Sequence, residues 1–125
     1  MAVTTLGLFN SKLISFFEDL AETYPEEKDI RMAKEGLEFA KKSNPRLIHD
    51  TFYEYVYKPL HEHILNENAD EVISYTRHAI QTQFNEIFSA LSIFEKHWPA
   101  MSDSNRSAIW KHLKVLVLLA EKAKQ

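Results

Sequence analysis

The residues of this chain that could bind a metal are its histidines, of which there are six. They are densest at His61-Glu62-His63. Side chains two positions apart on a helix point roughly 200° apart, so His61 and His63 could share an ion only if Pro59 left this stretch extended. The sequence contains no His-Glu-x-x-His motif and no Glu-x-x-His pair of the di-iron type. We therefore predict no bound metal and no cofactor.

Acid–base catalysis needs a carboxylate or an imidazole that is held in a pocket with a shifted pKa. The least ordinary acids are Asp50, which follows His49, and Glu54, one helical turn further on. Most other acids fall on the polar sides of amphipathic helices, which indicates a solvated surface. The chain has no cysteine that could act as a nucleophile and no glycine-rich loop that could hold a phosphate. We predict that it is not an enzyme.

Four aromatic residues close together could form a stacking platform for single-stranded nucleic acid. Such a platform needs basic residues among the rings, and only Arg46 and Lys58 are near. Packing in the core, with tyrosine hydroxyls at its boundary, is the favoured interpretation. The four residues are Phe52, Tyr53, Tyr55 and Tyr57.

The elements that position these residues are predicted to be helices, because apolar residues recur at the helical period and no segment has a partner strand. Tyr24-Pro25, Asn44-Pro45 and Pro99 separate the helices, Pro59 kinks or breaks the third, and Asn44, Asn68 and Ser102 (or Ser104) are candidate N-caps. The second helix has a further apolar strip, Met32, Gly36 and Phe39, which suggests that it lies between neighbours. The expected helices cover residues 5–23, 26–43, 45–57 with a short piece to about 66, 69–97 and 102–122. The fold class is therefore all-α, with residues 1–125 forming a single-domain bundle of about five helices.

Composition excludes several classes of protein. The chain of 125 residues is 45% hydrophobic and 26% charged, as in ordinary globular domains, and it has no cysteine for a disulfide scaffold. Its longest apolar run, residues 115–120, is far shorter than the roughly 18 residues of a membrane span. The first nine residues do not resemble a signal peptide. We expect an intracellular protein without a membrane partner, in the cytoplasm, the nucleus or a virion.

The last helix carries the candidate partner interface. Ile109, Leu113, Leu116 and Ala120 fall on one stripe of the helical wheel, which we assign to the core. Leu118 lies nearly opposite that stripe, and lysines surround it. An apolar patch framed by polar residues often marks an interaction site, although lysine stems can also cover single exposed apolar residues. The predicted interface consists of Val115, Leu118, Leu119, Lys111, Lys114 and Lys122.

The last third of the chain contains His97-Trp98-Pro99, Met101-Ser102 and residues 108–116, Ala-Ile-Trp-Lys-His-Leu-Lys-Val-Leu. Together with Phe16-Phe17-Glu18-Asp19-Leu20 and Tyr24-Pro25, this pattern resembles short, uncharacterised helical proteins of large double-stranded DNA viruses. The likeness spans nearly the whole chain, and its motifs are capping and packing residues. It implies a virion or host-interaction setting and carries no functional residues.

The sequence as a whole predicts a non-catalytic helical interaction or structural module that binds a protein partner or a second copy of itself. A weak, non-specific nucleic-acid-binding protein is the first alternative, because residues 104–125 carry five Lys or Arg against a single Glu. An enzyme of unknown class is the second.

Overall fold

A computed structural model describes residues 4–82 and 96–124, and its regular secondary structure in these residues is entirely helical. The all-α prediction is confirmed. The elements are α1 (Thr5–Thr23), α2 (Lys28–Ser43), α3 (Pro45–Phe52), the π-helix η1 (Tyr53–Tyr57), α4 (Lys58–Leu65), α5 (Ala69–Thr82), the 3-10 turn η2 (Trp98–Ala100) and α7 (Asp103–Lys124).

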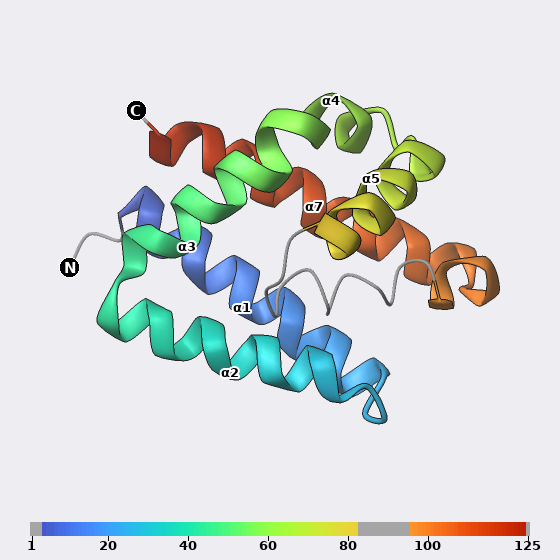
Figure 1. The fold of residues 1–125 in the computed structure, drawn as a ribbon, viewed down its shortest axis with the longest axis horizontal. Helices are drawn as coiled ribbons and strands as arrows, with labels where there is room; N and C mark the ends of the chain where they lie inside the picture. The colour runs from blue at the N-terminus through green and yellow to red at the C-terminus, as the bar shows by residue number, and fades with distance from the viewer. Residues whose placement is uncertain (1–3, 83–95, 125) are drawn as a thin grey trace.

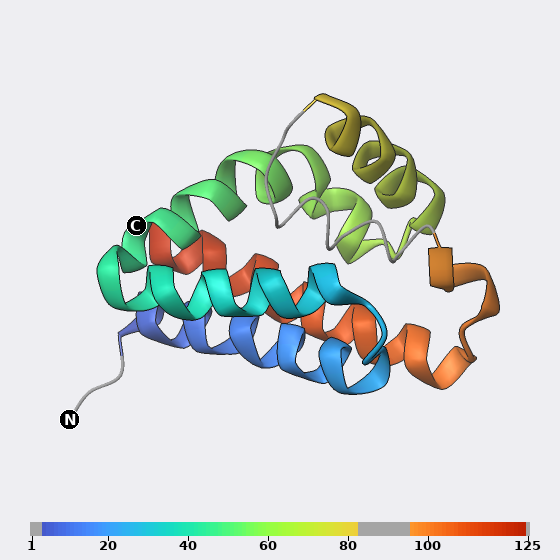
Figure 2. The same cartoon turned by 60° about the horizontal axis from the view of Figure 1, so that its bottom comes forward.

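The helices pack around α1 and α7, which lie side by side (Figures 1 and 2). Helix α2 packs against α1, and α3 contacts α1, α2 and α7. The path from α3 through η1 to α4 crosses α7, and α5 packs on α4. The start of α1 and the end of α7 lie at the same end of the molecule (Figure 1).

Local signals place the first two helices. Helix α1 has the predicted bounds, and the Thr4 hydroxyl caps it by accepting a hydrogen bond from the Gly7 amide at 2.9 Å. Helix α2 begins at Lys28, two residues later than predicted. The Glu27 amide donates to the Tyr24 carbonyl at 3.0 Å and closes a turn there. Glu26 and Glu27 therefore belong to the connection between the helices.

The predicted caps have different outcomes. Asn44 occupies the N-cap position of α3, but its side chain makes no capping bond, and its carbonyl accepts from the Leu47 amide at 3.1 Å. Ser102 caps α7 as predicted, since its hydroxyl accepts from the Asn105 amide at 3.1 Å. Helix α7 continues to Lys124, two residues beyond the expected end.

The effect of Pro59 appears in the turn before it. The helical path continues through the proline, but the α-helical pattern widens to a π-helix over Tyr53–Tyr57, where the Lys58 amide donates to the Tyr53 carbonyl. Proline has no amide hydrogen to give to the carbonyl four residues earlier, that of Tyr55. The Tyr75 hydroxyl donates to this carbonyl at 2.6 Å, and burial raises the pKa of the Tyr75 phenol. The predicted break at Pro59 is therefore wrong: the chain stays helical, and the departure from α-helix is a π-helix that ends two residues before the proline.

The fourth predicted helix is described only in part. Helix α5 starts at Ala69, with Asp70 and Glu71 in its first turn as expected. The prediction that it continues to about residue 97 falls largely on 83–95, which lie outside the described residues.

The core consists of one stripe from each main helix. Helix α1 has seven buried residues, and α2 buries Ile30, Ala33 and Leu37, the first of its two predicted strips. The second strip is not covered as predicted, because the Met32 and Phe39 side chains are 51% and 73% exposed. Ile30, Ala33 and Leu37 already form the face that α2 turns toward α1 and α3, and Met32 and Phe39 lie on its other side.

Candidate functional site

The predicted interface residues divide into two groups on α7. The core stripe Ile109, Leu113, Leu116 and Ala120 is buried, as predicted. Val115 and Leu118 are 40% and 49% exposed, whereas Leu119 is half-buried and packs against the core. The apolar surface of α7 that is available to a partner is therefore centred on Val115 and Leu118, and we call these two residues the α7 patch.

The lysines around the α7 patch also differ. Lys111 and Lys122 are exposed. The Lys114 ammonium lies 2.6 Å from Glu67 Oε2 and ties α7 to the connection between α4 and α5. Glu67 is itself held in the left-handed region, with φ of 54°. Lys111 and Lys122 are thus the residues of the predicted rim that a partner's carboxylates could reach most readily.

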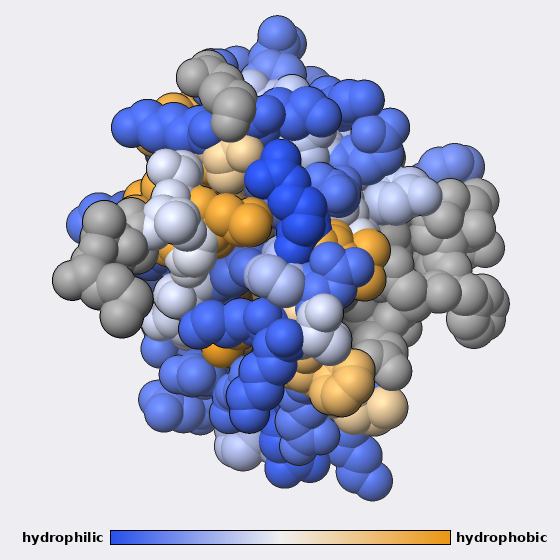
Figure 3. Space-filling view, turned by 90° about the vertical axis from the view of Figure 1, so that its left-hand side faces the viewer, coloured by the Kyte–Doolittle hydropathy of each residue, from blue (hydrophilic) through white to orange (hydrophobic). Residues whose placement is uncertain are grey.

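Apolar and hydrophilic side chains alternate on the end of the molecule where the termini lie. Figure 3 shows this face, with areas of hydrophobic surface bordered by hydrophilic side chains. Single exposed apolar residues are common on protein surfaces, and a contiguous apolar area bordered by hydrophilic residues can mark an interaction site.

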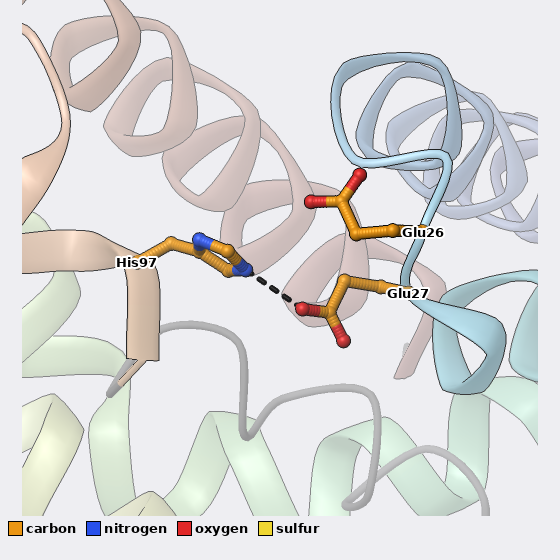
Figure 4. A group of neighbouring side chains, drawn as sticks. All are labelled: Glu26, Glu27 and His97. Carbon is orange, nitrogen blue, oxygen red and sulfur yellow. Dashed lines mark hydrogen bonds and ion pairs between the residues drawn. The ribbon is translucent and has the colours of Figure 1, made fainter.

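A second group of polar side chains joins segments far apart in the sequence. Glu26 and Glu27 project from the α1–α2 connection toward His97, which immediately precedes η2 (Figure 4). Each of the three offers a donor atom within 4.8 Å of the other two. The His97 Nε2 lies 2.8 Å from Glu27 Oε1, and the imidazole stacks on the Tyr24 ring at 4.3 Å between centroids. Sequence reasoning missed this group, because 70 positions separate Glu27 from His97.

Two carboxylates and an imidazole could in principle bind a divalent cation. Here the Lys96 ammonium lies 2.7 Å from the same Glu27 oxygen and already supplies a positive charge. Hydrogen bonds from Lys96 and His97 hold the pKa of the Glu27 carboxyl below its ordinary value of 4.5. These contacts of Glu27 with Lys96 and His97 join the α1–α2 connection to the chain before α7, and we call the three residues the ionic clasp. The absence of a metal stays a prediction.

Glu27→Gln is expected to destabilise the protein at neutral pH and to matter less in acid. A carboxyl whose pKa is lowered by folding stabilises the folded state above its unfolded pKa, and this contribution is lost as the pH falls through the folded value. The midpoint of urea unfolding should therefore be lower for the variant at pH 7, and the difference should shrink below about pH 4.

The neighbouring Glu26→Gln is the matched control, because Glu26 is exposed and carries the same charge one residue away. It should change the midpoint less than Glu27→Gln at pH 7. Equal effects of the two substitutions, or a difference that grows in acid, would contradict the clasp.

The histidines first considered for metal binding lie on a helix after all. His61 and His63 both belong to α4, where side chains two positions apart diverge. The His61 Nδ1 contacts the Tyr57 carbonyl at 2.8 Å, and its ring stacks on Tyr57. The extended conformation that would have let them share an ion is not present.

The two acids singled out for catalysis, Asp50 and Glu54, lie beside His49 and Lys58. His49 is fully buried, and its Nε2 lies 2.8 Å from the Ala120 carbonyl of α7. Asp50 is mostly exposed, with Oδ1 at 3.4 Å from His49 Nδ1, and Glu54 forms an exposed ion pair with Lys58 at 3.0 Å. The buried imidazole therefore links α3 to α7, and both carboxylates face solvent.

Another acid–imidazole pair lies at an open pocket of about 110 Å³ between α1 and α7. His112 Nε2 and Asp19 Oδ2 are 3.4 Å apart, and the imidazole stacks on Phe16. Both side chains are substantially exposed, so water surrounds the pair and the pocket offers little of the desolvation that tunes a catalytic group.

The aromatic rings of the third predicted helix stack mainly on one another. Tyr53 and Tyr57 are 4.6 Å apart and nearly parallel, and the stack continues to His49 on one side and His61 on the other. Phe52 is buried. Because these ring faces are occupied within the chain, Tyr53 and Tyr57 cannot offer them to nucleic-acid bases in this conformation.

Comparison with known family models, curated proteins and solved structures finds no match to this chain. In the part of the chain that the structure describes, no helix is both long enough and apolar enough to cross a bilayer.

Proposed function

We propose that this protein is a non-catalytic helical interaction module, and that the α7 patch is its docking surface. The observation that supports the proposal most directly is the exposure of Val115 and Leu118 on a helix whose opposite face is fully buried. An apolar patch framed by polar residues often marks an interaction site, so we assign these two exposed side chains to contact with a partner.

The charges around the α7 patch favour an acidic partner. Lys111 and Lys122 flank the patch, while Glu121 is the only acid in residues 104–125. A partner that presents an apolar helix with Asp or Glu beside its apolar residues would complement both features. The resemblance to viral proteins would make this partner a virion or host protein.

A symmetric dimer through the same patch is less favourable. If two copies of α7 packed antiparallel about a point between Val115 and Leu118, Lys111 of one copy would lie opposite Lys122 of the other. A two-fold interface brings each residue against the same surface of its partner, so like charges would meet at both ends. We therefore place a different acidic protein ahead of self-association.

Leu118→Asp is expected to abolish partner capture and leave the stability of the domain unchanged within about 0.5 kcal/mol. The new carboxylate sits at the centre of the apolar contact, where an unpaired charge would be desolvated on binding. Capture from lysate on immobilised protein, quantified by mass spectrometry, measures the loss, and light scattering reports any self-association.

Leu47→Asp is the matched control, because Leu47 of α3 is a similarly exposed leucine (52%) outside the α7 patch. It should retain every partner that the unchanged protein captures. If Leu118→Asp unfolds the domain, Leu118 belongs to the core; if it alters neither stability nor capture, the patch is ordinary surface. Binding of labelled DNA or RNA that is lost on Lys111→Ala but retained in Leu118→Asp would favour the nucleic-acid alternative.

A further inference from the structure

An apolar cavity that is partly open to solvent lies among the helices, away from the α7 patch. Its volume is about 50 Å³, and its walls come from α1, α3, η1, α4, α5 and α7. A single buried water needs only about 10–15 Å³, so the space would hold several. Protein cores are close-packed and contain few voids larger than one water molecule.

The described cavity wall has few polar side chains, and two of their hydroxyls already donate hydrogen bonds to backbone carbonyls. Thr51, Tyr55, Tyr75 and Thr76 are its lining residues with polar side chains. The Tyr75 hydroxyl donates to the Tyr55 carbonyl at 2.6 Å, and the Thr76 hydroxyl donates to the Val72 carbonyl at 2.9 Å. No charged side chain is among the described residues that line it. Water needs two to four polar partners, so this space suits an apolar occupant better than water.

The π-helix contributes part of the wall. Tyr55 and Val56, both in η1, line the cavity, and the wide turn there replaces the regular packing of an α-helix. Single π-helical turns inside α-helices are frequent at functional sites. Pro59 has no amide hydrogen for the Tyr55 carbonyl, and this carbonyl accepts a hydrogen bond from the Tyr75 hydroxyl. The π-helix thus shapes part of the wall, and Tyr75 provides a donor for the Tyr55 carbonyl.

We propose that this cavity is a binding site for a small uncharged hydrocarbon, a short aliphatic or single-ring aromatic molecule, held by apolar contact alone. A charged analogue is excluded, because the described lining residues provide no opposite charge and burial of an unpaired ion is strongly unfavourable. This site is independent of the docking surface on α7, and either proposal can fail without the other.

Benzene is a suitable probe, and benzoate is its charged counterpart of similar shape. Titration of the methyl-labelled full chain with benzene, followed by NMR, should give saturable shifts at methyl groups of the cavity wall, such as those of Leu60, Ile64 and Val72. The melting temperature should rise with benzene concentration, because a ligand that binds only the folded state stabilises it. Benzoate should produce neither effect.

Val56→Phe fills the cavity from η1 and should weaken benzene binding at least tenfold. Leu65→Phe places the same ring at an exposed leucine (43%) of α4 that does not line the cavity and should leave binding unchanged. Circular dichroism checks the fold of both variants, and Thr51→Leu, a smaller addition to the same wall, replaces Val56→Phe if that variant does not fold. The proposal is overturned if benzene near its solubility limit gives no saturable shifts, or if the shifts persist unchanged in the filled variant.

Discussion

Leu116→Ala is expected to lower the free energy of unfolding by roughly 2–5 kcal/mol, the range for truncating a buried leucine. Leu116 is 1% exposed, belongs to the core stripe of α7 and lines the apolar cavity. The substitution removes the side chain's apolar contacts and adds its volume to a void that already exists. Urea unfolding followed by circular dichroism measures the difference.

Leu118→Ala is the control for this experiment, because it removes the same atoms from the same helix at a position that is 49% exposed. It should cost about 0.5 kcal/mol or less, as is usual for surface substitutions. A Leu116→Ala variant that is no less stable than Leu118→Ala would mean that α7 presents a different face to the core.

The features that the sequence predicted well are those set by local chemistry. The bounds of α1 follow from helical periodicity and from Tyr24-Pro25, and these act on neighbouring residues whatever the rest of the chain does. The capping of α7 by Ser102 is local for the same reason. The division of α7 into a buried stripe and an exposed Leu118 also needs only the helical wheel, because one face of the helix must meet the core.

The features that the sequence did not predict depend on contacts between distant segments. The apolar strip with Met32 and Phe39 has the pattern of a buried face, but only the tertiary arrangement decides that α1 and α3 both contact the other face of α2. The group of Glu26, Glu27 and His97 has no sequence signal, since its members meet only when the α1–α2 connection approaches the chain before α7.

The helix around Pro59 combines both cases. The proline predicted a kink or a break of the helix, whereas the chain stays helical through Pro59 and widens to a π-helix just before it. The π-helical form of this disturbance is not local, because the carbonyl of Tyr55 is satisfied by Tyr75, a residue 20 positions away on α5. Sequence patterns therefore located the disturbance, and its geometry depends on packing between α5 and η1.

His49→Phe is expected to lower the free energy of unfolding by about 1–3 kcal/mol, the cost of leaving a buried polar group without its partner. The Ala120 carbonyl can only accept, so the His49 Nε2 at 2.8 Å carries the proton that it donates. Phenylalanine keeps a ring between Phe9 and Tyr53, whose ring centroids lie 5.5 and 5.7 Å from that of the imidazole. It removes the Nε2 donor and also Nδ1, which lies 3.4 Å from the mostly exposed Asp50. Urea unfolding at pH 7 measures the loss.

The control is His61→Phe, at the other end of the same aromatic stack. The contact of His61 with the Tyr57 carbonyl is only partly buried, so water can replace it and the change should be about 0.5 kcal/mol or less. If His49→Phe proved as stable as the unchanged protein, the hydrogen bond to α7 would not account for a fully buried imidazole. The buried His49 imidazole would then be a candidate for a chemical role, which would count against the proposal of a non-catalytic module.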